Sequence, residues 1–518
     1  MFVNFPLFIL IFALSFLLTL GVRRLALLLG VIDRPDGVRK IHGRAVPLMG
    51  GLAVFLAFFI GLFIVRDSLL AGNLEISHWL GFLAGAFILM VGGFLDDKYN
   101  LAPRWQIVFP ILAALSPIIG GVGIEKLSNP LGGFFVVPTI LSALLIIFWL
   151  LGMMYTTKLL DGVDGLVSGL GLIGALVIFL FTSTTQYFQP DIAMAAWIFA
   201  AACAGFLVLN FNPARIFLGE GGSLFIGYVL GVLAIISGGK IAIALLIMGL
   251  PILDVIWTIV RRLLKGKNPF RFADRQHLHH RLLDLGLSPR QTVAIFYFFA
   301  AAFGLSSLFL QSRGKLLALA SLLLIMLALV IFFSWWERKR RPSLFFHICC
   351  APCAAYSTWK LLLPHYQVVW YFYNPNLSSL AEYDRRLAAA RRAAKIIGVK
   401  LIAAPYRHEA WRDLVRGREV DEERGARCQL CYRERIKAAY DFARQGNYRY
   451  FSTSLLASPY KDSESIRAIC RELSMEGGPE FLDKDFQAED SFRASLAWAR
   501  EHGLYLQKYC GCEFSFRQ

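Results

Sequence analysis

Charged residues are scarce in this sequence. Asp, Glu, Lys and Arg make up 17% of its 518 residues, apolar types make up 57%, and the mean hydropathy is +0.56. Soluble domains usually carry about 25% charged residues. The composition therefore excludes a protein that is soluble along its whole length and places the chain among membrane proteins.

Long apolar runs are missing from one part of the chain. From Arg338 onward the chain has no apolar run long enough to span a bilayer, whereas the part before it consists mostly of such runs. We therefore expect a membrane domain over residues 1–336, a basic linker over 337–342 and a soluble domain over 343–518. The first apolar run, 2–20, lacks a basic leading region and a clear small-residue cleavage site, so we interpret it as a retained span.

Apolar runs of roughly 17–25 residues mark candidate transmembrane helices. We expect about eleven of them, so the predicted fold class is a polytopic α-helical membrane domain followed by a soluble α/β domain. The predicted spans are 2–20, 48–65, 79–95, 105–119, 134–152, 166–182, 191–209, 222–237, 240–260, 291–310 and 315–336.

Lysine and arginine are unevenly divided among the loops. They gather in loops 21–47 and 261–290 and in the segment after the last span, whereas loops 66–78, 120–133 and 183–190 contain few. With eleven spans the basic loops share one side, which the positive-inside rule assigns to the cytoplasm. We expect a multi-pass protein of the cytoplasmic (inner) membrane, with its N-terminus outside and its soluble domain in the cytoplasm.

Asp96 and Asp97 stand directly after the apolar run 79–95. An ionised carboxylate in hydrocarbon is costly, so such residues suggest a functional site. Side by side at the membrane edge they suit a hard cation such as Mg2+, although taken alone they could equally be a helix end that faces water. The other loops on the predicted cytoplasmic side also carry acids, bases or histidines, which favours one site that gathers a metal and phosphates.

This set of residues suits phosphoryl transfer between a soluble nucleotide and a lipid phosphate. Both partners are polyanions, so Mg2+ held by carboxylates would offset their repulsion. Arg, Lys and His bind phosphates, and the glycine-rich segments 161–165 and 219–222 would let the backbone approach a ligand closely. Each motif alone also has a structural explanation, such as a helix cap at Asp161 or Asp164 or an exposed polar turn at 277–280.

Five motifs in one order give the membrane part a resemblance to the polyprenyl-phosphate N-acetylhexosamine-1-phosphate transferases of glycosyltransferase family 4. They are Arg39-Lys40-x-His42 with Pro47-x-x-Gly50-Gly51, Gly93-Phe-Leu-Asp96-Asp97-Lys98, Leu160-Asp161-Gly-Val-Asp164-Gly-Leu166, Asn212-Pro213-Ala214-Arg215-x-Phe217-x-Gly219, and His277-x-His279-His280. The resemblance implies transfer of an N-acetylamino-sugar 1-phosphate, with GlcNAc 1-phosphate expected, from a UDP-sugar to undecaprenyl phosphate. It also implies Mg2+, release of UMP, and a place in cell-wall or polysaccharide biosynthesis.

The same resemblance implies roles for single residues. It implies that the catalytic acids are Asp96, Asp97, Asp161 and Asp164. It also implies that the Mg2+ ligands are Asp97 and Glu220. The residues expected to bind substrate are Lys40, His42, Lys158, Asn212, Arg215, His277, His279 and His280.

Two positions depart from the resembled family. Glu220 stands where the family usually has Asp, and we expect it to shift the metal and not to lose it. Lys158 stands where the family usually has Asn, and a cation there could pair with a phosphate or change the choice of sugar. Both departures leave the identity of the sugar open.

The soluble part alternates predicted strands with helical patterns. We expect strands at 343–348, 366–373, 399–403 and 450–454 and a long helix at 381–397. This order indicates an α/β domain with a parallel sheet.

Cysteine is rare before this domain and frequent within it, since eight of nine cysteines lie beyond position 348. Their grouping in short motifs favours metal or redox chemistry in a reducing compartment over disulfides. Three clusters hold too many thiols for one structural zinc and fit an iron–sulfur site with thiols to spare. The candidate ligands are Cys349, Cys350, Cys353, Cys428, Cys431, Cys510 and Cys512. Cys470 lies in a helical pattern, and we expect it in the core.

These clusters belong to a set of motifs that resembles the Cys-rich, cobalamin-independent epoxyqueuosine reductases. The set comprises His347-x-Cys-Cys-Ala-Pro-Cys353, Tyr373-Asn-Pro-Asn376, Glu382-Tyr383, Arg427-Cys-x-x-Cys-Tyr432, Thr453-x-Leu-Leu-x-Ser-Pro-Tyr-Lys461, Lys484-Asp-Phe486 and Tyr509-Cys-Gly-Cys512. The resemblance implies reduction of epoxyqueuosine to queuosine in tRNA, with a 4Fe-4S cluster and a nearby second iron. It leaves open which cysteines hold which metal.

Two alternatives remain open from the sequence. The soluble part could be a zinc or redox module that regulates the transferase, and the membrane part could be a transporter or lipid scaffold without catalysis. The polysaccharide pathway, the electron donor, the oligomeric state and any coupling between the two parts are also left open.

Overall fold

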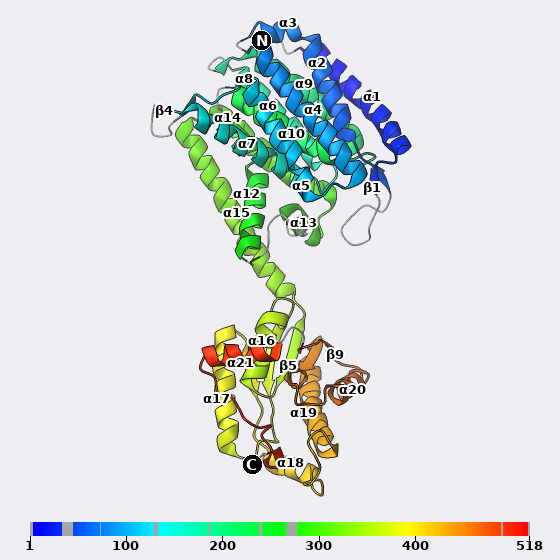
Figure 1. The fold of residues 1–518 in the computed structure, drawn as a ribbon, viewed down its shortest axis with the longest axis vertical. Coiled ribbons are helices and arrows are strands. Elements are labelled where there is room, and N and C mark those ends of the chain that lie inside the picture. Colours follow the sequence, from blue (N-terminus) through cyan, green and yellow to red (C-terminus); the bar gives the residue numbers. More distant parts are fainter. Residues whose placement is uncertain are drawn as a thin grey trace. The chain divides into compact units, whose positions relative to one another are not determined.

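The computed structural model describes residues 4–33, 45–72, 74–128, 133–184, 187–237, 241–264, 266, 277–487 and 491–515. The chain divides into two compact units, Met1–Ile331 and Phe332–Gln518. We call them the membrane unit and the cysteine-rich unit, and describe each by itself (Figure 1).

The membrane unit is built from apolar helices. Among the described residues, seven helices are long and apolar enough to cross a membrane. They are α1 (Phe5–Leu29), α4 (Ile76–Tyr99), α7 (Thr139–Leu160), α9 (Pro190–Asn210), α10 (Gly219–Ile236), α14 (Pro289–Phe309) and Ser312–Trp336 of α15 (Ser312–Arg340). Shorter apolar helices are α2 (Gly50–Ile64), α5 (Pro103–Gln106) with α6 (Val108–Ile119), and α8 (Leu166–Thr182).

The predicted number of eleven spans is not confirmed, although each predicted run overlaps an apolar helix. The run 240–260, expected as one span, forms two helices, α11 (Ile241–Ile247) and α12 (Gly249–Leu264), bent by 80°. Gly249 adjoins the break, and Pro251 cannot donate a hydrogen bond to the carbonyl four residues before it. The pair is a broken span or a re-entrant segment, so the orientation of the chain stays a prediction.

Helix α10 lies at the centre of the membrane unit, with nearly all of its residues buried. It packs against α2 and α4 through glycines. A Cβ atom on Gly93 of α4 would lie 2.1 Å from the backbone of Gly221, and one on Gly51 of α2 would lie 2.0 Å from the Cα of Gly222. Such glycines let helix backbones approach closely. The contact places the last turn of α4, with Asp97, beside the first turn of α10.

Smaller elements complete the membrane unit. Two short antiparallel pairs join β1 to β2 and β3 to β4. These elements and the short helices are β1 (Ile32–Asp33), β2 (Val46–Pro47), β3 (Lys126–Ser128), β4 (Phe134–Val136), α3 (Arg66–Leu70) and α13 (Leu278–Asp284).

In its described residues the cysteine-rich unit holds a five-stranded sheet in the order β7–β6–β5–β8–β9, with every pair parallel. The strands are β5 (Ser343–Ile348), β6 (Gln367–Phe372), β7 (Lys400–Ala403), β8 (Tyr450–Thr453) and β9 (Glu480–Phe481). The predicted parallel α/β fold is confirmed. Strand β9 escaped prediction because two residues are too short to show an alternating pattern.

Helices surround this sheet (Figure 1). They are α16 (Ala351–Ser357), α17 (Leu380–Ile397), α18 (His408–Leu414), α19 (Ala426–Gln445), α20 (Ser463–Ser474) and α21 (Ser491–Glu501). The predicted helix 381–397 corresponds to α17, which begins after the Ser379 side chain accepts the Glu382 N–H and ends at Gly398 with φ 73°. The central strand β5 lies between β6 and β8, and its carboxyl end leads directly into Cys349, which is where open parallel sheets place their ligands.

Candidate functional sites

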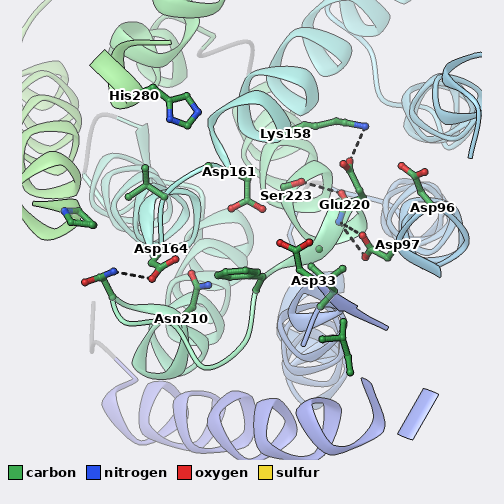
Figure 2. Close-up of a pocket in the computed structure, with 18 of the residues that line it drawn as sticks. Asp33, Asp96, Asp97, Lys158, Asp161, Asp164, Asn210, Glu220, Ser223 and His280 are labelled. Atoms are coloured by element: carbon green, nitrogen blue, oxygen red, sulfur yellow. Dashed lines mark hydrogen bonds and ion pairs between the residues drawn. The ribbon is translucent and has the colours of Figure 1, made fainter. Parts of the chain in front are cut away.

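A cavity of about 700 Å³ lies in the membrane unit. Its lining comes from segments far apart in the sequence: β1, the end of α4, α5, the end of α7, the end of α9, the start of α10, and α13. The acidic, basic and amide side chains, with one serine, are those of Asp33, Asp96, Asp97, Asn100, Gln106, Lys158, Asp161, Asp164, Asn210, Asn212, Glu220, Ser223 and His280. Figure 2 shows the carboxylates of Asp33, Asp97 and Asp161 pointing into the same hollow.

The adjacent acids Asp96 and Asp97 have different surroundings. The Asp97 carboxylate accepts the backbone N–H of Glu220 at the start of α10, at 3.1 and 3.3 Å to its two oxygens. Asp96 is buried, and its Oδ1 accepts the Leu101 N–H at 2.9 Å and the Gln106 amide at 3.1 Å. Asp97 is therefore held by a helix N-terminus, which favours a negative charge, whereas Asp96 holds the turn after α4.

Asp161 and Asp164 lie in the turn between α7 and α8. Asp164 accepts the Asn212 amide at 2.9 Å and the Ala214 N–H at 3.0 Å, so it fixes the loop after α9. Asp161 lines the cavity and is exposed there. The surrounding protein, together with the nearby carboxylates of Glu220, Asp97 and Asp164, raises the pKa of Asp161 to about 8.

Lys158 and Glu220, the two positions that depart from the resembled family, contact each other. The Lys158 Nζ lies 2.7 Å from Glu220 Oε2 (Figure 2). It also donates to Gln106 Oε1 at 3.4 Å. One ammonium group therefore sits at the acidic end of the cavity.

The charge balance of the cavity suits a divalent cation. Six carboxylates line it, and the basic side chains among its described lining residues are Lys158 and His280. Within the described residues, no three of these acids bring ligand atoms within 4.8 Å of one another. Mg2+ does not need such a cage, because it usually binds through one or two carboxylates, substrate phosphates and water. The donor set thus fits Mg2+ together with a phosphate ligand.

The three predicted histidines form one cluster, but only His280 lines the cavity. His277 Nδ1 lies 2.9 Å from Asp254 Oδ2 of α12, and the other oxygen of Asp254 accepts the Leu278 N–H at 2.9 Å. The buried His279 ring stacks on His277 with 5.7 Å between ring centroids, and burial with the two neighbouring histidines lowers its pKa. His277 and His279 therefore support the position of His280.

The remaining predicted substrate-binding residues fall elsewhere. Arg215 is exposed and is not among the residues that line the cavity, and its backbone oxygen accepts the Arg23 side chain at 3.2 Å. Lys40 and His42 lie outside the described residues.

Sequence reasoning gave no role to five polar residues of the cavity, which are Asp33, Asn100, Gln106, Asn210 and Ser223. Asp33 belongs to an acidic and basic loop that drew attention as a whole, so a signal existed. Asn210 and Ser223 adjoin predicted motifs, so they also had a signal, whereas Asn100 and Gln106 had none, since a lone amide at a helix end is ordinary.

In the cysteine-rich unit, Cys349, Cys350 and Cys353 place their sulfur atoms within 4.8 Å of one another, and all three are buried. Ser454 Oγ lies 3.3 Å from the Cys349 sulfur and accepts the Cys349 N–H at 2.9 Å. Contacts with the Cys350 and Cys353 thiols hold the pKa of Cys349 well below its ordinary value. Three convergent thiols at the end of β5 are compatible with metal binding and fit three ligands of an iron–sulfur cluster.

The other predicted cysteines lie beyond that 4.8 Å group in the described chain. Cys431 and Cys512 pack with Trp411. The Cys510 sulfur accepts a hydrogen bond from Lys461 at 2.9 Å. Burial alone would raise the pKa of Cys510, but Lys461 and nearby arginines outweigh it, so the pKa falls below its ordinary value.

A buried cation links the cysteine clusters. Arg435 of α19 is 2% exposed and interacts electrostatically with Cys431, Cys349 and Cys510, one from each cluster. Its guanidinium also donates to the Asn374 side chain at 2.5 Å. One cysteine of each cluster therefore lies near the same buried positive charge. Cys470 lies in the hydrophobic core, as predicted.

Comparison with known proteins identifies both units. Residues 79–238 match the model of glycosyl transferase family 4, and residues 344–518 match that of epoxyqueuosine reductase QueH. A probable undecaprenyl-phosphate N-acetylglucosaminyl 1-phosphate transferase of Bacillus subtilis is 33% identical over 310 residues, which cover 58% of this chain and 82% of the relative.

Two further relatives agree with this match. A decaprenyl-phosphate N-acetylglucosaminephosphotransferase of Mycobacterium tuberculosis is 32% identical over 55% of this chain and 78% of its own length. An undecaprenyl-phosphate alpha-N-acetylglucosaminyl 1-phosphate transferase of Yersinia pestis is 28% identical over 57% of this chain and 80% of its own length. The chain therefore belongs to glycosyl transferase family 4, among relatives of the polyprenyl-phosphate N-acetylglucosaminyl 1-phosphate transferases, and carries a second domain of the epoxyqueuosine reductase QueH family.

Proposed function

We propose that the membrane unit transfers N-acetylglucosamine 1-phosphate from UDP-N-acetylglucosamine to undecaprenyl phosphate and releases UMP. The observation that carries this proposal is the acidic cavity where the ends of α4 and α7, the start of α10 and α13 meet. The names of the relatives, which specify undecaprenyl or decaprenyl phosphate and N-acetylglucosamine, support it.

In the proposed reaction an oxygen of the lipid phosphate attacks the β-phosphorus of the UDP-sugar. The bond from that phosphorus to the oxygen bridging both phosphates breaks, and its electron pair leaves with UMP. Mg2+ would be held by Asp97 and Glu220 and would neutralise charge on the diphosphate. A bound metal would also favour the ionised form of Asp161 at the same site.

The other residues of the cavity bind and orient the two polyanions. Lys158 and His280 contact phosphate oxygens, which are natural partners for cationic and imidazole donors. Asp164 holds the loop that carries Asn212 and thereby shapes the nucleotide side of the cavity. For Asp96 a positioning role fits its bonds to Leu101 and Gln106 better than the catalytic role expected from the sequence.

The location of the reaction follows from the same proposal. A lipid phosphate reaches the cavity from the bilayer, and the UDP-sugar reaches it from the cytoplasm. We therefore propose the cytoplasmic membrane as the site, with the N-terminus outside and the cysteine-rich unit in the cytoplasm, in line with the basic loops.

For the cysteine-rich unit we propose reduction of epoxyqueuosine to queuosine in tRNA. Two electrons and two protons convert the epoxide to an alkene and water, and the electrons come from an external one-electron donor. Cys349, Cys350 and Cys353 would hold a 4Fe-4S cluster with thiols from the other clusters, and a second iron would take the remainder. A cluster supplies electrons one at a time, and Arg435 keeps a positive charge beside the thiolates.

The decisive experiment uses the full chain in detergent with undecaprenyl phosphate and a panel of UDP-sugars. Release of UMP with UDP-N-acetylglucosamine supports the transferase, and no release with any sugar would favour a transporter or scaffold. Anaerobically purified chain is analysed in parallel for iron and sulfide and is tested on tRNA that contains epoxyqueuosine. Absence of iron and sulfide would favour a regulatory role for the cysteine-rich unit.

A further inference from the structure

Lys158 is the only lysine among the described residues that line the cavity, and its charge is directed at an acid proposed to bind metal. Its Nζ lies 2.7 Å from Glu220 Oε2, and the two side chains are 18% and 35% exposed. The pair is thus partly withdrawn from water, where the attraction between opposite charges is stronger than on an open surface.

Neighbouring side chains support this position of the ammonium group. Gln106 accepts from Lys158 through Oε1 at 3.4 Å and donates to Asp96 through Nε2 at 3.1 Å. Figure 2 shows Lys158 reaching across from α7 toward Glu220. The lysine is therefore held in the part of the cavity where a metal would bind.

An ammonium group and a divalent cation compete for Glu220. A metal bound by Glu220 and Asp97 would be repelled by an Nζ that stayed in place. Lysine carries a compact charge on a flexible four-carbon stem, so the ammonium can leave Glu220 while α7 stays fixed. The strongest acceptor for it is then a phosphate oxygen of a ligand in the same cavity.

We propose that Lys158 is a mobile counter-cation, which binds Glu220 in the metal-free cavity and moves to a phosphate of a nucleoside diphosphate when a divalent cation takes Glu220. This inference rests on the proposed transferase function. It couples the two ligands, because a diphosphate that attracts the ammonium frees Glu220 for the metal. By linkage, the metal strengthens binding of the diphosphate by the same factor.

Binding of Mn2+ to the full chain in detergent, followed by electron paramagnetic resonance with and without UDP, tests this coupling. A chain with both Asp97→Asn and Glu220→Gln serves as the blank, because it keeps any Mn2+ bound elsewhere, including by the cysteine-rich unit. Lys158→Met removes the charge and keeps most of the length. We expect it to bind Mn2+ about tenfold more tightly without UDP, which corresponds to ~1.4 kcal/mol. UDP should enhance Mn2+ binding less than in the parent chain.

Lys158→Arg provides a second, independent change. A guanidinium can bind a carboxylate through two hydrogen bonds, so this variant should bind Mn2+ more weakly than the parent, and the comparison stands even if Lys158→Met fails to fold. Equal Mn2+ affinity in the parent and either folded variant, with an unchanged UDP effect, would overturn the proposal and leave the transferase function intact. Equal Mn2+ binding by the parent and the blank would instead remove the metal site on which the proposed function depends.

Discussion

The carboxylate of Asp97 accepts the backbone N–H of Glu220, although 123 positions separate the two residues in the chain. The hydrogen bond joins the last turn of α4 to the first turn of α10, where unpaired helix N–H groups favour an anion. It fixes the direction of Asp97 while the side chain still lines the cavity. The site therefore depends on how closely α4 and α10 pack as well as on the charge of Asp97.

The charge itself is tested by Asp97→Asn. The amide oxygen can still accept the Glu220 N–H, so we expect a folded protein whose rate of UMP release falls by about 10²–10³-fold, the usual cost of losing one group that stabilises charge in the transition state. Asp67→Asn is the control, because Asp67 is 93% exposed on α3. An Asp97→Asn chain as active as the control would contradict the proposed role.

The packing is tested by Gly93→Ala. The new Cβ would meet the backbone of Gly221 at 2.1 Å, and backbone cannot yield as a flexible side chain does. Overpacking of this kind lowers the stability of the folded protein by about 1–3 kcal/mol, so we expect a lower thermal unfolding temperature. We also expect a loss of transferase activity, because Asp97 would move away from α10.

Gly152→Ala is the matched control for this helix contact. Gly152 lies within α7, and nothing lies within 4 Å of a Cβ built there. Alanine is favoured over glycine in a helix interior by about 1 kcal/mol, so this variant should unfold at the same or a higher temperature. Equal destabilisation by both substitutions would show that close packing at Gly93 is not the cause.

The sequence predicts the parts of this protein that repeat a local pattern. Apolar runs locate the helices of the membrane unit, and alternating strands and helices locate the parallel sheet, because both patterns reflect burial along the chain. The 80° bend between α11 and α12 escapes a hydropathy window, which averages across Gly249 and Pro251. The same holds for the site. Acids next to membrane spans can be recognised in the sequence, whereas Gln106 lines the cavity only because of tertiary contacts.

Roles within a motif are harder to predict than the motif itself. The three histidines at 277–280 were expected to bind substrate together, yet His277 faces Asp254, a residue 23 positions away on α12. Only the folded chain shows that one histidine lines the cavity while its neighbour makes a buried contact. The same applies to Lys158 and Glu220, whose separate departures from the family pattern become a single ion pair.

Metal binding by the cysteine-rich unit is tested with Cys349→Ser. Cys349 lies in the buried group of three thiols at the end of β5, and a hydroxyl is a poor substitute for a thiolate ligand of iron. We expect anaerobically purified variant to retain markedly less iron and sulfide than the parent, with loss of the visible absorption of an iron–sulfur cluster. Transferase activity should be unchanged, since the acids of the cavity are untouched.

Cys470→Ala is the control for this cysteine substitution. Cys470 is fully buried in the hydrophobic core of the same unit, on α20. Its removal should lower stability modestly, as small core truncations do, but should leave the iron and sulfide content per folded chain at the parental level. Equal iron loss in both variants would mean that Cys349 acts through folding and not as a ligand.

The support of the histidine cluster is tested at Asp254, which is 2% exposed and accepts both the His277 ring N–H and the Leu278 N–H. Asp254→Ala leaves these buried donors without their acceptor, at a cost of about 1–3 kcal/mol. Asp254→Asn keeps one acceptor oxygen and should cost less. Because Leu278 begins α13, which carries His280 into the cavity, we expect the alanine variant to raise the KM for the UDP-sugar more than it lowers kcat.

Thermal unfolding and steady-state UMP release are measured on the same preparations. Together they separate the effect of Asp254 on stability from its effect on the KM for the UDP-sugar. Asp67→Ala, which removes an acid that is 93% exposed on α3, is the control and should change neither measurement appreciably. A variant Asp254→Ala that loses stability but keeps the parental KM would show that the bonds to His277 and Leu278 serve folding alone. A raised KM in both the alanine and the asparagine variants, in proportion to their lost hydrogen bonds, would instead establish Asp254 as the residue that positions the histidine cluster for the substrate.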